Sequence, residues 1–145
     1  MERVSNRLIE RKTMNQFTVT AATQVIGRML MSAIFLMAGI SKLGSYATTQ
    51  SYMDSVGMPG ALLPLVILLE LGGGLAVLLG WQTRISAFLL AGFCLLSALI
   101  FHANFGDQMQ SILFMKNMAM AGGFLLLLAG GAGAWSVDAR RQTGA

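Results

Sequence analysis

The sequence contains few charged residues, one cysteine and one histidine, and each shortage excludes a class of protein. Charged residues make up 11% of the 145 residues, whereas a soluble domain carries about a quarter. The single thiol of Cys94 cannot form an internal disulfide or a CxxC relay. With His102 as its one histidine, the chain cannot ligate a haem on two sides or complete a zinc site. We therefore expect no metal centre and no encoded redox cofactor, and an enzyme that acts alone is the least favoured function.

Long apolar runs take the place of charge. Hydrophobic residues make up 55% of the chain, and its mean hydropathy is +0.67. A helix of about 20 apolar residues crosses a bilayer, and four segments approach that length: about 25–43, 61–79, 85–105 and 115–134. The runs do not alternate as strands do, and a helix satisfies its own backbone groups in lipid. The sequence therefore predicts an all-α fold, an integral membrane four-helix bundle over residues 25–138, surrounded by the lipid bilayer.

The distribution of basic residues predicts how the chain is oriented. In a four-span topology the N-terminal tail (1–24), the second connection and the C-terminal tail (139–145) share one side of the membrane. That side holds eight of the ten Lys and Arg residues: Arg3, Arg7, Arg11, Lys12, Arg28, Arg84, Arg140 and Arg141. The opposite side holds Lys42 and Lys116. The positive-inside rule places both tails in the cytoplasm and explains the net charge of +4 without a nucleic-acid partner.

Glu70 is the acidic residue in the middle of the second apolar segment. An isolated ionised carboxylate at that depth costs several kcal/mol, so it must be protonated, paired or hydrated. An ion pair with Lys42 or Lys116 is the structural interpretation, and a functional site is the alternative. Gly73 and Gly74 follow three and four residues later, on the same helical face. Without side chains they would leave a slot beside the acid for a helix or a flat ligand.

The predicted topology brings other polar residues near Glu70. Lys42, His102, Lys116 and Asn117 fall at one level near the non-cytoplasmic side, with Glu70 about 14 Å from the start of its helix. We expect Glu70 and His102 to transfer protons, as catalytic residues. The expected ligand-binding residues are Lys42, Gly73, Gly74, Lys116 and Asn117. Alternatively, the lysines extend to the membrane surface and His102 is an ordinary interfacial histidine.

Several segments, taken in order, resemble the DoxX family of membrane proteins. They are GRMLMSAIFLMAGISKL (27–43), YMDSVGMP (52–59), LLELGGGLAVLLGWQTR (68–84) and MKNMAMAGGFLLLLAGGAGAWSVD (115–138), with His102 between the last two. The resemblance implies a small bacterial inner-membrane protein of four helices. The family is named after a subunit of a thiosulfate:quinone oxidoreductase. Other members are tied to membrane oxidoreductase complexes and oxidative-stress defence, and distant eukaryotic relatives are cargo receptors or assembly chaperones.

Three functions remain open from the sequence. The first is an accessory or quinone-interacting subunit of a membrane oxidoreductase or oxidative-stress system, with quinone as the ligand and oxidoreductase subunits as partners. The second is a non-enzymatic assembly or cargo-binding protein. The third is a small proton-coupled transporter. Oligomerisation is compatible with all three. Gly72, Ala76 and Gly80 repeat every four residues, which allows the helices of the bundle to approach closely.

Overall fold

The computed structural model describes residues 2–143, and side chains from residue 10 onward. The only regular secondary structure in the described chain is helix, with no strands, which confirms the all-α prediction. Its elements are α1 (Glu2–Gly44), α2 (Tyr46–Ser55), η1 (Gly60–Leu62), α3 (Leu63–Leu68), η2 (Leu69–Gly73), α4 (Gly74–Leu79), α5 (Thr83–Phe101), α6 (Gln108–Gly130) and α7 (Val137–Thr143). Within this range, four segments are long and apolar enough to cross a membrane: Glu10–Gly44, Gly60–Leu79, Thr83–Phe101 and Gln108–Gly130.

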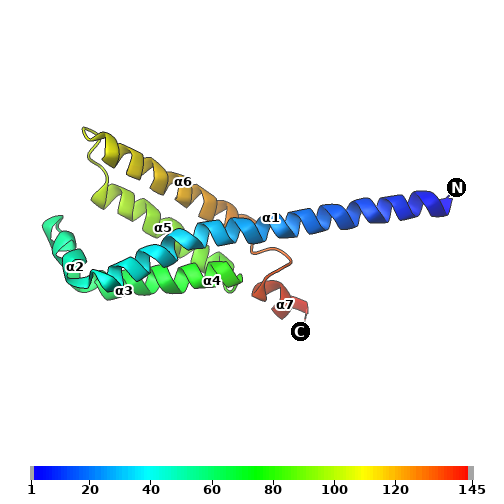
Figure 1. The fold of residues 1–145 in the computed structure, drawn as a ribbon, viewed down its shortest axis with the longest axis horizontal. Helices are drawn as coiled ribbons and strands as arrows, with labels where there is room; N and C mark the ends of the chain where they lie inside the picture. The colour runs from blue at the N-terminus through cyan, green and yellow to red at the C-terminus, as the bar shows by residue number, and fades with distance from the viewer. Residues whose placement is uncertain (1, 144–145) are drawn as a thin grey trace.

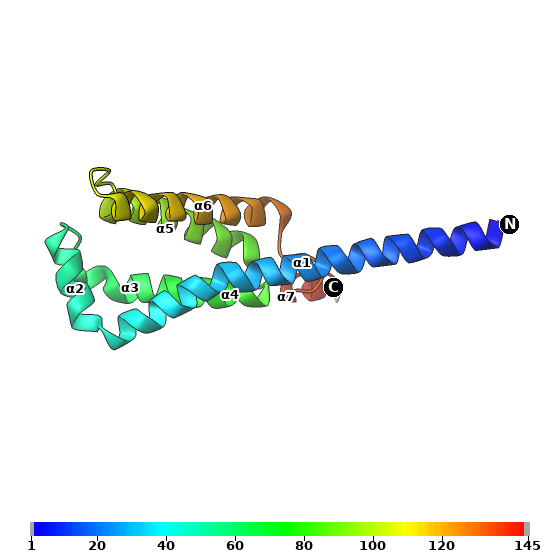
Figure 2. The same ribbon diagram turned by 45° about the horizontal axis from the view of Figure 1, so that its top comes forward.

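The four spans form two pairs that diverge from a common region (Figures 1 and 2). One pair is α1 with the span that runs from η1 to α4, and the other is α5 with α6. The pairs meet near the turn between α4 and α5, which we call the narrow end. They separate toward the connections that follow α1 and α5, which we call the wide end. Helix α2 lies at the wide end, and α7 lies at the narrow end.

The second span changes its helical geometry midway. Pro64 lies in the first turn of α3, where its missing N–H costs no hydrogen bond. The turn Leu69–Gly73 is π-helical, with hydrogen bonds that span one residue more than in an α-helix. Three consecutive glycines at 72–74 lower the preference for regular α-helix at this point. Helix α4 then ends at Leu79, and Gly80 follows as a glycine C-cap with a φ of +67° and the hydrogen bonds of such a cap.

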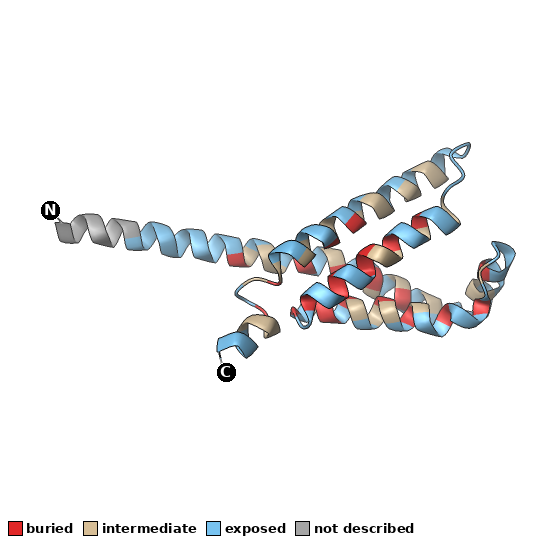
Figure 3. Ribbon diagram, turned by 180° about the vertical axis from the view of Figure 1, so that it is seen from behind, coloured by how far each residue is buried: buried red, intermediate tan, exposed pale blue. Residues whose placement is uncertain are grey.

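The main core fills the region where the two pairs meet. Phe35 of α1 packs edge-to-face against Phe124 of α6, with ring centroids 5.3 Å apart. Leu90 and Cys94 of α5 are completely buried in the same cluster, so Cys94 is a packing residue. Apolar side chains such as Leu126 are highly exposed, as expected where lipid is the solvent. Figure 3 shows that exposed positions recur along all four spans.

Some helices begin at other residues than the sequence predicted. Helix α1 begins at Glu2, so the basic segment 1–24 continues the first span as helix, because it contains no glycine or proline to end it. Helix α6 begins at Gln108, seven residues before the predicted 115, because the Asp107 carboxylate accepts hydrogen bonds from the N–H groups of Met109 and Gln110. Helix α2 occupies a connection for which the sequence predicted no helix.

Candidate ligand-binding site

Glu70 forms an ion pair across two elements. It lies in η2, and its Oε1 accepts a hydrogen bond from Nζ of Lys42, which lies in the last turn of α1, at 2.8 Å. The structure therefore pairs the buried acid with Lys42 and not with Lys116. The second carboxylate oxygen, Oε2, is buried and has no hydrogen-bond partner. A buried acceptor without a partner costs free energy unless a ligand or water donates to it.

A cavity of about 290 Å³ lies beside this pair, in the half of the bundle toward the wide end. Side chains from α1, α2, α3, η2, α5 and α6 line it, so both helix pairs contribute to its walls. Its polar lining consists of Lys42, Thr49, Glu70, Ser97, His102 and Asn117. Its aromatic lining consists of Phe35, Tyr52, Phe93 and Phe101. The cavity therefore offers hydrogen-bonding groups set among flat apolar surfaces, which is the usual composition of a small-molecule site.

His102 and Asn117 are each held in place by a hydrogen bond. The Nδ1 atom of His102, at the end of α5, is 2.8 Å from Oε1 of Gln110 in α6. The Nδ2 atom of Asn117 donates to the carbonyl oxygen of Leu113, one turn earlier, at 3.0 Å. These bonds restrict both side chains to the cavity wall. Among residues 10–143, no three His, Cys, Asp and Glu side chains are placed to hold a metal ion.

Comparison with known proteins identifies the family. The sequence model of the family described as DoxX matches residues 23–103. The chain belongs to the DoxX family. Inner membrane protein YqjF of Escherichia coli (strain K12) is 53% identical over 114 residues, which cover 79% of this chain and 88% of that protein. Inner membrane protein YphA of the same strain is 35% identical over 138 residues, which cover 88% and 99% respectively. No solved structure matches the chain.

These relatives and the four apolar helices together show a multi-pass protein of the inner membrane. The family match includes five of the six polar cavity residues, Lys42, Thr49, Glu70, Ser97 and His102, and ends before the sixth, Asn117. The cavity of this DoxX-family protein therefore combines groups from inside and outside the matched segment.

Lys116 does not join the site. It is exposed and borders a separate shallow pocket on α6, together with Gln108 and Met115. Successive residues of an α-helix point about 100° apart, so Asn117 can face the cavity while its neighbour faces outward. The prediction that Lys116 belongs to the same cluster is wrong, although its level along the helix agrees with the topology.

Gly73 and Gly74 do not line the cavity either, so the predicted slot is absent. A Cβ atom on Gly73 would lie 3.2 Å from the side chain of Leu90 in α5. A Cβ atom on Gly74 would lie 3.2 Å from the side chain of Leu36 in α1. The glycines allow these helices to pack closely against the second span, and neighbouring side chains fill the space that the slot required.

The sequence reasoning missed the aromatic wall of the cavity. Tyr52 of α2 stacks on Phe101 of α5, with ring centroids 5.8 Å apart and planes 26° apart. This contact joins the two helix pairs across the wide end. Met53, the next residue of α2, is buried against Leu63 and Ile67 and holds α2 on the second span. Tyr52 lies in one of the segments that resemble the family, but no hydropathy or charge pattern distinguishes it.

Proposed function

We propose that this DoxX-family protein binds the headgroup of a quinone in the Glu70 cavity and acts as an accessory subunit of a membrane oxidoreductase. The observation that supports this most directly is the buried Oε2 of Glu70, which has no partner and belongs to a cavity wall. A quinol hydroxyl would donate a hydrogen bond to that oxygen. The matching donors for quinone carbonyls are Nζ of Lys42 and the ring of His102.

The shape of the cavity supports a flat ligand. A volume of about 290 Å³ is near the lower limit for small-molecule sites and suits a single ring system. Phe35, Phe93 and Phe101 provide apolar faces against which an aromatic or quinoid ring can pack. Apolar side chains such as Ile34, Val66 and Met120 complete the cavity wall, which favours a lipid-soluble molecule over a hydrophilic one.

The polar residues also suit the proton chemistry of such a ligand. Reduction of a quinone to a quinol takes up two electrons and two protons, and the partner oxidoreductase would supply the electrons. Glu70 and His102 are the titratable groups in the cavity that can exchange protons with its contents, while Lys42 balances the carboxylate charge. This chain would therefore bind, orient and protonate the ligand.

The test is the quinone content of protein purified in mild detergent from native membranes, measured by mass spectrometry of the extracted lipids. We expect wild type to retain close to one quinone per chain, and Asn117→Ala and Glu70→Gln to retain several-fold less. Lys116→Ala is the matched control, because Lys116 is adjacent in sequence and outside the cavity; it should bind like wild type. Equal content in all four proteins, or none in wild type after incubation with excess quinone, would contradict the proposal.

A second candidate, a non-enzymatic partner protein, is favoured by the extension of α1. Beyond the narrow end this helix leaves the bundle (Figure 1), and its apolar side chains Met14, Phe17 and Val19 are exposed. Such a helix can bind a groove on another protein. If His102→Ala preserves growth under oxidant or sulfur stress while removal of residues 1–20 abolishes it, this second function replaces the first.

A further inference from the structure

A second polar region lies at the narrow end, around the connection between α6 and α7. Its most deeply buried charge is Arg28 of α1, whose side chain is 3% exposed. Its Nη2 donates to the carbonyl oxygen of Trp135 at 2.6 Å and its Nη1 to that of Leu78 at 3.4 Å. Its Nε atom is buried and has no hydrogen-bond partner. The sequence suggested that Arg28 only orients the chain in the membrane, but the structure places it inside the bundle.

Arg28 borders a crevice of about 230 Å³ between α1 and α6. Apart from Gln24, the rest of the crevice is apolar or small: Gly27 and Met31 of α1 face Gly123, Leu126 and Leu127 of α6. Leu126 is among the most exposed side chains of the bundle, so the crevice borders the lipid. The apolar part of the crevice suits the acyl chain of a phospholipid, and the arginine beside it suits the charged headgroup.

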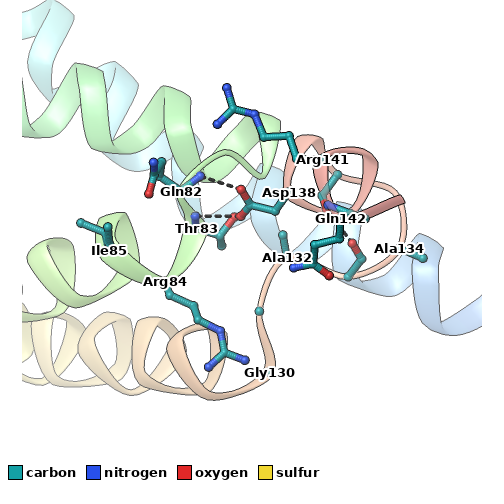
Figure 4. Close-up of a pocket in the computed structure, with 14 residues that line it drawn as sticks. Gln82, Thr83, Arg84, Ile85, Gly130, Ala132, Ala134, Asp138, Arg141 and Gln142 are labelled. Carbon is teal, nitrogen blue, oxygen red and sulfur yellow. Dashed lines mark hydrogen bonds between the residues drawn. The ribbon is translucent and has the colours of Figure 1, made fainter. Parts of the chain in front are cut away.

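The crevice adjoins a larger pocket of about 720 Å³ through Gly130 and Gly131, which line both. Figure 4 shows Arg84 directed toward Gly130 from one side of this pocket, with Arg141 on the other side. The Nε and Nη2 atoms of Arg84 lie 3.9 Å from the position of a Cβ on Gly131. The guanidinium of Arg84 therefore lies beside Gly131, and Arg28 lines the crevice that the same two glycines border.

One carboxylate, that of Asp138, opposes these arginines: it lines the larger pocket and interacts electrostatically with Arg28 and Arg141. Both carboxylate oxygens of Asp138 accept backbone hydrogen bonds, from Gln82 at 2.8 Å and Thr83 at 2.9 Å (Figure 4). Among residues 10–143, the ion pair of Lys42 and Glu70 is the only one within 4 Å, so neither Arg28 nor Arg84 has a carboxylate partner there. The narrow end therefore offers an incoming anion an excess of positive charge, with Arg28, Arg84, Arg140 and Arg141 against the carboxylate of Asp138.

The tryptophans locate this charge at the membrane surface. Trp81 follows α4, Trp135 precedes α7, and both are exposed at the narrow end. Tryptophan is enriched at the level of lipid headgroups. Basic pockets between membrane helices at this level are a known means of binding anionic lipid headgroups. Because the pocket lies at the headgroup level and adjoins the crevice, a lipid whose phosphate lies in the pocket can place an acyl chain in the crevice.

We propose that the narrow end is a binding site for an anionic phospholipid, with its phosphate beside Arg28 and Arg84 at Gly130–Gly131 and an acyl chain in the crevice between α1 and α6. The site is independent of the quinone cavity, which lies toward the other end of the bundle. It also differs from the nonspecific contact of any membrane protein with the surrounding lipid. The proposed site selects lipids with a negatively charged headgroup and holds one acyl chain in a defined crevice.

The experiment measures the melting temperature of detergent-purified, delipidated protein with added phosphatidylglycerol or phosphatidylcholine, and with glycerol phosphate or inorganic phosphate at matched concentration. We expect phosphatidylglycerol alone to raise Tm, by about 5 °C near saturation. Equal shifts with both lipids would overturn the proposal. A shift with glycerol phosphate or inorganic phosphate would also overturn it, since the site would then bind soluble phosphate compounds.

Two variants with matched controls locate the site. Gly27→Leu would fill the crevice without a collision, because no atom lies within 4 Å of its Cβ position. Gly122→Leu is its control, with an equally open Cβ position on α6 outside the crevice. Arg84→Gln removes an exposed pocket charge, whereas Arg140→Gln removes an exposed charge outside both pockets. We expect Gly27→Leu and Arg84→Gln to lose most of the phosphatidylglycerol shift and both controls to keep it; any other division would overturn the proposal.

Discussion

Lys42 and Glu70 are bonded at 2.8 Å but unequally buried: the lysine side chain is 27% exposed and the glutamate side chain 4%. Removing one partner of a buried pair is costly chiefly because the other is left uncompensated. The buried partner is Glu70, so Lys42→Met should destabilise the bundle by about 3–5 kcal/mol. Glu70→Gln should cost much less, because Lys42 can reach water. Loss of Lys42 without any change in the unfolding transition would show that the carboxylate is hydrated or neutral.

The double variant Lys42→Met with Glu70→Gln separates the cost of an uncompensated charge from the cost of lost packing. If the uncompensated carboxylate causes the loss, adding Glu70→Gln to Lys42→Met should recover most of the stability. Unfolding in detergent mixtures, followed by circular dichroism, gives the four free energies of the cycle. Additive losses would mean that the two side chains stabilise the protein independently.

Gly80, in the turn between α4 and α5, should not tolerate substitution. Its φ is +67°, and an added Cβ would collide with Nη1 of Arg28 and approach Ser136. We expect Gly80→Ala to lower the free energy of unfolding by at least about 2 kcal/mol, from strain and overpacking together. Gly92→Ala is the control, because Gly92 is helical and has nothing within 4 Å of its Cβ position. It should be neutral or slightly stabilising, and similar losses at both positions would contradict this account.

Asp138 should make stability depend on acid pH. Burial alone would raise its pKa, but the backbone hydrogen bonds from Thr83 and Gln82 and the charge of Arg141 outweigh burial and lower the pKa. Its contribution is therefore complete above the unfolded-state pKa of about 3.9 and is lost as the pH falls through the lower folded-state value. Melting temperatures between pH 3 and 7 should converge for wild type and Asp138→Asn at the acid end. A constant difference across that range would exclude this linkage.

Both termini should lie on the cytoplasmic side, as the eight basic residues at that end predict. Reporter fusions after residue 143 should be active in the cytoplasm and inactive in the periplasm, and insertions near Gly57 in the first connection should show the reverse. Periplasmic activity of the C-terminal fusion would invert the orientation. The Glu70 cavity would then open toward the cytoplasm, and the basic narrow end would face the periplasm.

Sequence patterns predicted what depends on length and hydropathy. The four spans follow from apolar runs, and the proximity of Lys42, Glu70, His102 and Asn117 follows from the level that each residue reaches in an alternating topology. The position of a residue along a helix does not determine which way its side chain points around the helix axis. The expectation that Lys116 faces the cavity fails for this reason. The interpretation of Gly73 assumed 3.6 residues per turn, and the π-helical turn at Leu69–Gly73 breaks that periodicity.

The burial of Arg28 had no sequence signal. Arginine near the end of an apolar segment normally extends to the membrane surface. The groups that receive its hydrogen bonds are backbone carbonyls, at Leu78 and Trp135, and any residue type presents a carbonyl. These partners lie 50 and 107 residues away in sequence, so only the folded arrangement reveals them.

The divergence of the two helix pairs gives the cavity the geometry of a wedge. Its vertex is the aromatic packing of Phe35 and Phe124, and its open side is bridged by Tyr52 and Phe101. In a wedge, the width at any point is the opening angle multiplied by the distance from the vertex. A slight rotation of one helix pair about the vertex moves all the residues on that wall of the cavity together. It therefore changes the cavity volume more than the movement of a single wall residue does. Selectivity for ring size then depends on how the pairs are joined, and a substitution at Phe124, which does not line the cavity, can alter it without touching the ligand.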